Sequence, residues 1–146
     1  MMNGYFNLNQ LAMITGLTTR TLRNYIASGV LGGEKRDGVW SFTEEEVDVF
    51  VSNEAVRRSI SARQNGVVLD FLAEVYKRSN RICVIMDLAG GPEELQEASA
   101  CFCKAISERG RDIEFRSRRE KQVSRVILAG GEDQVIDLLR EYYGAH

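Results

Sequence analysis

The sequence is poor in the residues on which several kinds of functional site depend. It has one proline, one histidine (His146) and three cysteines among 146 residues. A single histidine nearly excludes histidine-based triads and multi-histidine metal sites. An odd number of cysteines does not make a disulfide framework, so we expect reduced thiols. We therefore expect no metal and no cofactor.

Long apolar runs and an excess of one charge are also missing. The longest apolar runs are five to eight residues, against roughly 20 for a membrane-spanning helix, and residues 1–16 lack the charged start of a signal peptide. The formal charge of -2 argues against a basic coat that binds nucleic acid or membranes unselectively. With 44% hydrophobic and 27% charged residues, the composition is that of a soluble globular protein. We expect a cytoplasmic protein without membrane contact.

Residues 1–52 begin with capping signals for two helices. Asn7 can cap a first helix, which ends before Gly16. Thr18 is a good N-cap for a second helix within residues 18–28, and a glycine directly after that segment stops it. The segment is therefore expected to form helix, tight turn and helix.

A hairpin and a third helix follow. Asp37 and Gly38 form a strong turn signal in the segment 32–42, between a basic strand and an apolar one. Thr43 and Glu46 have the capping-box arrangement and open a helix. The buried stripe of that helix is predicted to be Val47, Phe50 and Val51.

Residues 53–79 are predicted to form a helical linker that also joins two copies of the chain. Apolar residues recur there at spacings of four and seven, and the stripe has no obvious cover of its own. Such a stripe suggests packing against a second copy. Asn65-Gly66 either separates two helices or lies inside one long helix. The stripe consists of Val56, Ile60, Val67, Phe71 and Val75, widened by Val68, Leu72 and Tyr76.

Residues 80–146 have the predicted order β-α-β-β-α. The apolar run 82–88 suits a strand buried on both faces, and Pro92 followed by two acidic residues starts a helix. Two strands and a last helix complete most of a ferredoxin-like unit without its final strand. The missing strand would leave the first strand at a sheet edge that needs a cover. The two helices are expected to bury Leu95, Ala98, Phe102, Ala105, Ile106, Val135, Leu138, Leu139 and Tyr142.

Three motifs within residues 5–52 occur in an order known from one protein family. They are Thr15-Gly16 at the turn, Thr21-Leu22-Arg23-Asn24-Tyr25 in the second helix and Gly29-Val30-Leu31 before the hairpin. This pattern resembles the winged helix-turn-helix DNA-binding domain of the MerR family. That family usually has an aromatic residue before the tyrosine and an arginine-aromatic pair on the second wing strand, where this chain has Asn24 and Val39-Trp40-Ser41-Phe42.

The resemblance implies a transcription regulator that binds double-stranded DNA as a homodimer through two half-sites, and it leaves a contact with RNA polymerase open. The expected fold class is α+β with three parts. They are a winged helix-turn-helix domain (1–52), a helical linker and dimerisation segment (53–79) and an α+β domain for assembly or effector binding (80–146). No effector is indicated.

The second helix carries a face suited to a major groove. At about 100 degrees per residue, Arg20, Asn24 and Ala27 lie opposite Leu22. Arginine can bridge guanine O6 and N7, and asparagine can bridge adenine N6 and N7. The resemblance adds Tyr25, whose hydroxyl would reach a phosphate. The other candidate contacts, to the DNA backbone or the minor groove, are Thr18, Thr19, Thr21, Arg23, Lys35 and Arg36.

Residues 1–52 hold four basic and six acidic side chains, so the expected DNA-binding domain is itself acidic. The acidic residues collect in the third helix, away from the basic residues of the second helix and the hairpin. We therefore expect weak nonspecific binding by one subunit. Useful affinity would come only from two linked half-sites.

Two further clusters, one of cysteines and one of basic residues, are candidate ligand sites. Cys101 and Cys103 would lie about 200 degrees apart on a helix and cannot easily chelate one ion, so structural thiols are expected. The basic run 116–121, with Arg125 close by, lies in a predicted hairpin. It could hold an anionic effector, but an exposed charged turn that discourages edge pairing is the favoured interpretation.

Two alternatives to a regulator remain open. A tryptophan on the wing, Trp40, also fits excisionase-like architectural proteins that bend DNA, although we expect its ring in the hairpin core. The domain 80–146 could instead bind a small molecule, while the N-terminal domain directs the protein to DNA. No nucleophile-base pair or phosphate loop supports catalysis, so no enzyme is expected.

Overall fold

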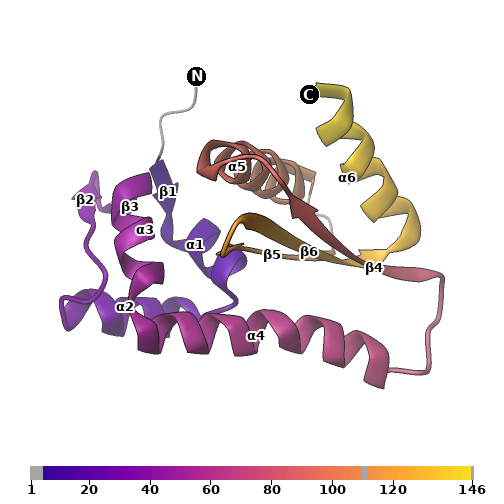
Figure 1. Cartoon of the computed structure of the whole chain (residues 1–146), viewed down its shortest axis with the longest axis horizontal. Coiled ribbons are helices and arrows are strands. Elements are labelled where there is room, and N and C mark those ends of the chain that lie inside the picture. The colour runs from indigo at the N-terminus through magenta and orange to yellow at the C-terminus, as the bar shows by residue number, and fades with distance from the viewer. Residues whose placement is uncertain (1–4, 110–111, 146) are drawn as a thin grey trace. The chain divides into compact units, whose positions relative to one another are not determined.

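The part of the chain that the structure describes, residues 5–109 and 112–145, forms six helices and two three-stranded antiparallel sheets (Figure 1). The structure is a computed structural model. It confirms the predicted α+β class. The chain divides into two units, Met1–Arg63 and Gln64–His146, and the boundary lies inside a helix. The single histidine, His146, lies outside the described residues.

The sheet of the first unit contains a strand that the sequence does not predict. This strand, β1 (Tyr5–Asn7), pairs with β3 (Val39–Thr43). The other side of β3 pairs with β2 (Glu34–Arg36), so the order is β1-β3-β2. Asp37 and Gly38 connect β2 to β3 with φ of 51° and 79°, which confirms the predicted tight turn.

Three helices of the first unit begin at the predicted caps. In each helix, the cap side chain accepts a hydrogen bond from the backbone N–H three residues later. In the first and third helices, the residue at that position returns a bond to the cap, which completes a capping box. The first helix ends at Gly16, whose φ is 80°. The caps are Asn7 for α1 (Leu8–Thr15), Thr18 for α2 (Thr19–Ala27) and Thr43 for α3 (Glu44–Ser52).

The core of the first unit includes Phe42, which is fully buried. A methyl group at Gly33 would lie 2.5 Å from the Phe42 ring, so the chain before β2 requires glycine at this position. Helices α1, α2 and α3 supply further buried side chains. The predicted stripe of α3 is confirmed, because Phe50 is fully buried and both valines pack against the core. The core consists of Leu8, Leu11, Leu17, Leu22, Leu31, Phe42, Phe50, Val56 and Ile60.

The second unit has the predicted order of strands and helices. Its elements along the chain are β4 (Arg81–Leu88), α5 (Pro92–Arg109), β5 (Ile113–Glu120), β6 (Val123–Gly131) and α6 (Glu132–Ala145). The central strand β6 pairs antiparallel with both of its neighbours, so the sheet order is β4-β6-β5. Helices α5 and α6 pack on the sheet and supply much of its core.

Aromatic contacts join α5, α6 and β5. The ring centroid of Phe102 lies 5.4 Å from that of Phe115 and 5.0 Å from that of Tyr142. All three side chains are buried, as are most residues of the two predicted helical stripes. The buried side chains of this layer include Ala98, Phe102, Ile106, Phe115, Val126, Leu128, Val135, Leu138 and Tyr142.

The predicted linker 53–79 forms one helix, α4 (Glu54–Ala73), which contributes residues to both units. It runs through Asn65 and Gly66 without interruption. Of the two arrangements that this dipeptide permits, the structure therefore contains the single long helix. The helix covers less of the chain than the predicted segment does.

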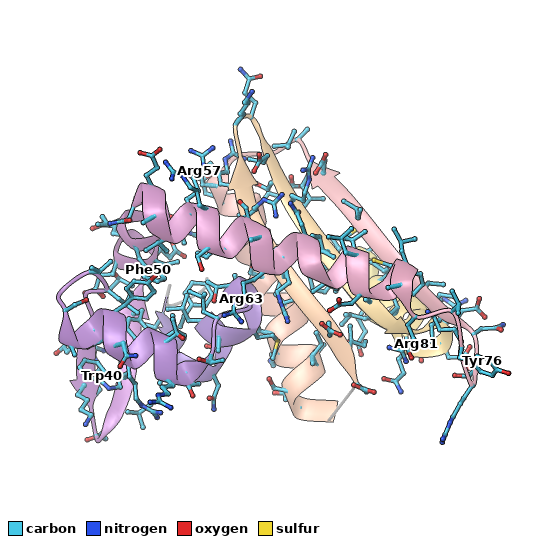
Figure 2. All side chains as sticks on the ribbon, turned by 90° about the horizontal axis from the view of Figure 1, so that it is seen from below. Trp40, Phe50, Arg57, Arg63, Tyr76 and Arg81 are labelled. Atoms are coloured by element: carbon cyan, nitrogen blue, oxygen red, sulfur yellow. The ribbon has the colours of Figure 1, made fainter. Side chains whose placement is uncertain are left out.

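Two residues predicted on the α4 stripe, Val75 and Tyr76, lie beyond the end of the helix. They are 85% and 92% exposed, and Figure 2 shows Tyr76 in the connection that follows α4. The ammonium of Lys77 donates to the carbonyl oxygens of Phe71 and Glu74, so it satisfies acceptors that a helix end leaves open. The prediction that the stripe continues to Val75 and Tyr76 is therefore wrong.

The buried part of the α4 stripe is covered by the same chain. Val56 and Ile60 join the core of the first unit. Val67 packs against Ile127 and Ala129 of β6 in the second unit. The prediction that this stripe lacks a cover of its own is wrong for these residues, because the covering strand lies far away in the sequence.

Strand β4 lies at an edge of its sheet. Among the described residues only β6 pairs with it, and Ile85 in its middle is 53% exposed. The prediction that segment 82–88 is buried on both faces is therefore wrong. Its edge position instead agrees with the expectation from a β-α-β-β-α order without a final strand.

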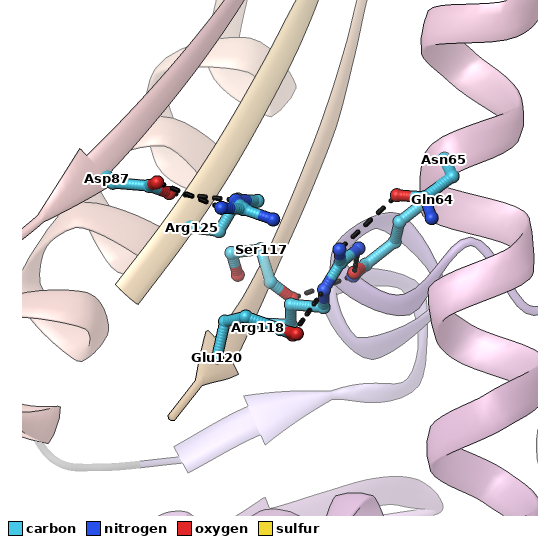
Figure 3. A network of polar contacts seen from close by, with 7 residues as sticks. All are labelled: Gln64, Asn65, Asp87, Ser117, Arg118, Glu120 and Arg125. Atoms are coloured by element: carbon cyan, nitrogen blue, oxygen red, sulfur yellow. Dashed lines mark hydrogen bonds and ion pairs between the residues drawn. The ribbon is translucent and has the colours of Figure 1, made fainter. Parts of the chain in front are cut away.

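A polar network fastens α4 to β5 within the second unit (Figure 3). The Gln64 side chain is fully buried, and its Nε2 donates to the carbonyl oxygen of Ser117 at 2.7 Å. Arg118 donates to Gln64 Oε1 at 3.0 Å, to Asn65 Oδ1 at 3.2 Å and to Glu120 Oε2 at 3.1 Å. Both ends of the buried amide are thereby satisfied, as burial of a polar group requires.

Replacing Gln64 with leucine tests this attachment. Q64L keeps a side chain of similar size but removes the donor to Ser117 and an acceptor of Arg118. We expect the free energy of unfolding to fall by about 2 kcal/mol, because a buried carbonyl loses its partner. The control N65A removes only an exposed contact and should change it by less than about 0.5 kcal/mol. Urea denaturation of the full chain measures both, and equal effects would contradict the assignment.

Candidate nucleic-acid interface

The outer face of α2 has the residues predicted for it. Arg20, Asn24 and Ala27 are exposed, and so is Arg23. On the other side of the helix Leu22 is fully buried in the core of the first unit. The core therefore fixes the rotation of α2 about its axis and leaves two arginines and an asparagine facing outward.

The threonines at the start of α2 stabilise its N-terminal turn. The hydroxyl of Thr18 accepts the backbone N–H of Thr21 at 3.1 Å and donates to the hydroxyl of Thr21 at 3.0 Å. Thr18 is exposed, whereas Thr19 and Thr21 are half-buried. The hydroxyl of Thr18 thus holds the N-terminus of α2, where backbone N–H groups favour an anion.

Tyr25 anchors α2 and the segment that leads to the hairpin. Its half-buried ring meets Phe50 of α3 edge-on, with the centroids 5.3 Å apart. Its carbonyl oxygen accepts the N–H groups of Val30 and Leu31 at 2.9 and 3.1 Å. Gly29, with φ of 83°, makes this reversal of the chain without strain. Tyr25 therefore has a clear structural role besides its predicted phosphate contact.

The two basic residues of the hairpin point to opposite faces. Lys35 pairs across the ladder with Trp40, and Arg36 pairs with Val39. Adjacent strand residues alternate between the faces of a sheet. Both residues are exposed. The structure thus places one positive charge on each face of the hairpin and does not combine the two in one cluster.

Arg36 is held by a residue that sequence reasoning missed. Its guanidinium lies 4.4 Å from the centroid of the Tyr5 ring, and Nη2 donates to the Tyr5 hydroxyl at 2.9 Å and to Glu34 Oε2 at 3.4 Å. The hydrogen bond to Tyr5 and the electrostatic interaction with Tyr5, followed by the charge of Glu34, raise the pKa of Arg36. Because Tyr5 belongs to the unpredicted strand β1, no local signal in the sequence could reveal this contact.

Trp40 has the structural position expected for it. Its ring stacks on Phe42 with the centroids 6.4 Å apart and an angle of 13° between the planes, and it packs against the core of the first unit. The ammonium of Lys35 lies 5.6 Å from the centroid of the Trp40 ring. Lys35 thus makes a cation–π contact with the ring of Trp40 in the hairpin.

The basic run 116–121 in the second unit lies mostly within strand β5. Arg116 pairs with Glu114 at 3.6 Å. Nearby, Arg125 donates to both carboxylate oxygens of Asp87 at 2.8 and 2.9 Å, and Figure 3 shows this bidentate pair. The favoured prediction of an exposed charged turn is wrong for these arginines, because they lie in strands and pair with acidic neighbours.

The cysteines are not brought together as metal ligands. Cys103 is buried, and Cys83 and Cys101 are half-buried. In residues 5–109 and 112–145, no group of three or more histidine, cysteine or acidic side chains could hold a metal ion. Burial raises the pKa of the Cys103 thiol to about 12 and also raises the pKa values of the other two thiols.

Comparisons with models of protein families, with curated proteins and with solved structures find no match to this chain. None of the helices in the described ranges has the length and apolar character that crossing a membrane requires. The candidate interface therefore rests on its own geometry. It comprises the outer face of α2 and the two faces of the β2–β3 hairpin.

The raised pKa of Cys103 predicts an inert thiol. At pH 8 only about one Cys103 in ten thousand carries the reactive thiolate, and burial also blocks access. Iodoacetamide should therefore label Cys83 and Cys101 well before Cys103 in the folded protein, and all three in denaturant. Mass spectrometry of the alkylated peptides measures this order. Labelling of Cys103 as fast as Cys101 in the folded protein would show that the α5 core opens readily.

Proposed function

We propose that this chain is a dimeric, sequence-specific DNA-binding transcription regulator of the MerR type. In this proposal α1 and α2 form a helix-turn-helix, α2 enters the major groove and the β2–β3 hairpin is the wing. The protein acts in the cytoplasm on double-stranded DNA, and RNA polymerase is a candidate contact. The proposal assigns the chain no catalysis, cofactor or metal.

The observation that carries the proposal is the exposed stripe on α2. A helix fixed to the core by Leu22 presents Arg20, Asn24 and the small Ala27 outward. Arginine and asparagine are the side chains that contact guanine and adenine edges through paired hydrogen bonds. A small residue beside them allows the backbone to approach the groove.

Other groups of the first unit suit contacts to the DNA backbone. The capped N-terminus of α2 favours a phosphate, and Arg23 is exposed on the flank of the same helix. On the wing, Arg36 and Lys35 extend from opposite faces of the hairpin. Such contacts set the position of the protein on the duplex without distinguishing sequences.

The distribution of charge supports binding by a dimer. The first unit is acidic in its third helix, where Glu44, Glu45 and Glu46 occupy the first turn. Within residues 1–52, the four basic residues lie on α2 and the hairpin. One such domain has few positive charges to attract phosphates, so two linked half-sites would be needed for tight binding.

Replacing Arg20 and Arg23 tests the role of α2. DNA fragments selected by the wild-type protein from genomic DNA provide the target. R20A/R23A should weaken binding to the selected site by about 100-fold, because a base contact and a phosphate contact are lost. Gel-shift titrations measure the affinity, and circular dichroism should stay unchanged because both side chains are exposed.

The matched control is R78A/R140A, which removes the same charge from exposed positions of the second unit. It should change the affinity less than twofold. Equal losses in the two double variants would indicate an effect of net charge alone. Full sequence selectivity in R20A/R23A would refute the assignment of α2.

A further inference from the structure

The free edge of β4 is apolar along most of its length. Strand β4 contains Ile82, Cys83, Val84, Ile85 and Met86 between its ends, and no proline interrupts it. Of the strands in the described ranges, only β6 pairs with it, on one side. An unpaired edge of this kind exposes a row of backbone donors and acceptors that another strand can use.

Exposed apolar side chains flank this edge on both faces of the sheet. Ile85 is 53% exposed. On the face that bears α6, Tyr143 is 57% exposed and its hydroxyl lies 3.5 Å from the sulfur of Met86. Both side chains lose exposed apolar area if a further strand joins at β4, which favours such an addition.

The charges at the two ends of β4 make the strand complementary to itself. In an antiparallel pair related by a two-fold axis through Val84, Arg81 lies opposite Asp87 of the partner subunit. Residues 81, 83, 85 and 87 all share one face, so the pairing keeps the faces of the two sheets aligned. Axes through Cys83 or Ile85 would shorten the overlap and separate the opposite charges.

Asp87 can accept this additional partner. Its carboxylate already binds Arg125 in a bidentate pair, yet the side chain remains 40% exposed. A carboxylate offers about four acceptor sites. Arg81 of the partner subunit would add to the existing ion pair without replacing it.

We propose that β4 pairs antiparallel with β4 of a second copy, centred on Val84, and forms a continuous six-stranded sheet across the dimer. Each half of this interface contains Arg81 opposite Asp87 of the partner subunit. The inference deepens the proposed function, since it rests on the dimer proposed there and specifies the surface that forms it. The segment 53–79 is predicted to join two copies of the chain, but part of its apolar stripe already packs in the cores of its own chain.

Disulfide cross-linking tests the register. In a C83S/C101S background, V84C places two cysteines on the axis, with Cα atoms about 4.5–5.5 Å apart. I82C lies on the same face of the strand, but its two copies would be about 14 Å apart. Under a mild oxidant V84C should form a covalent dimer on a non-reducing gel, and I82C should not. Efficient cross-linking of I82C instead would overturn the register.

A charge variant gives a second test that needs no new cysteine. R81E places like charges opposite each other at both ends of the interface, so the dimer dissociation constant should rise by about tenfold. The matched control R78E changes an exposed residue outside β4 and should leave that constant unchanged. Sedimentation equilibrium of the full chain measures both. An unchanged constant in R81E, or a monomeric wild-type protein, would overturn the interface.

The tests separate this interface from the proposed DNA binding. A wild-type monomer that still selects specific DNA would refute the β4 interface and the proposed dimer, and would leave the assignment of α2 in place. A dimer that cross-links through V84C but selects no DNA would refute the proposed function and support the interface.

Discussion

One helix, α4, has to bury residues in two separate hydrophobic cores. Val56 and Ile60 complete the core of the first unit, and Val67 covers part of the second sheet. Between them the helix carries Gln64, a buried amide that is acceptable only because Ser117 and Arg118 satisfy it. Gly66 lowers helix stability by about 1 kcal/mol relative to alanine, so packing and the polar network have to hold this part of α4 together.

Prediction from the sequence succeeds for features that depend on short-range hydrogen bonds. Asn7, Thr18 and Thr43 each cap a helix by bonding a backbone N–H three residues away. The Asp37-Gly38 turn is equally local, since positive φ at both positions follows from residue type. The exposed stripe of α2 follows from helical periodicity once the caps fix its ends. For this reason most of the candidate interface could be located from the sequence alone.

The features that sequence reasoning missed depend on partners far away along the chain. Strand β1 is too short to show a period, and it exists because β3 pairs with it. The contact of Tyr5 with Arg36 follows from that pairing. Apolar spacing alone extends α4 to Tyr76, whereas the helix ends at Ala73, and Lys77 binds the carbonyl oxygens of Phe71 in its last turn and of Glu74 directly after it. Composition likewise overestimates the burial of β4, because it does not distinguish an edge strand from a central one.

The stacking of Trp40 on Phe42 has a practical consequence. Trp40 is the single tryptophan of the chain, so selectively excited indole fluorescence originates from the hairpin and from nowhere else. Its ring also lies beside the exposed side chain of Lys35, so a molecule that binds at this side chain would change the surroundings of the ring. The hairpin therefore contains an intrinsic optical reporter, with which its opening, its docking and the unfolding of the first unit can be followed without any attached dye.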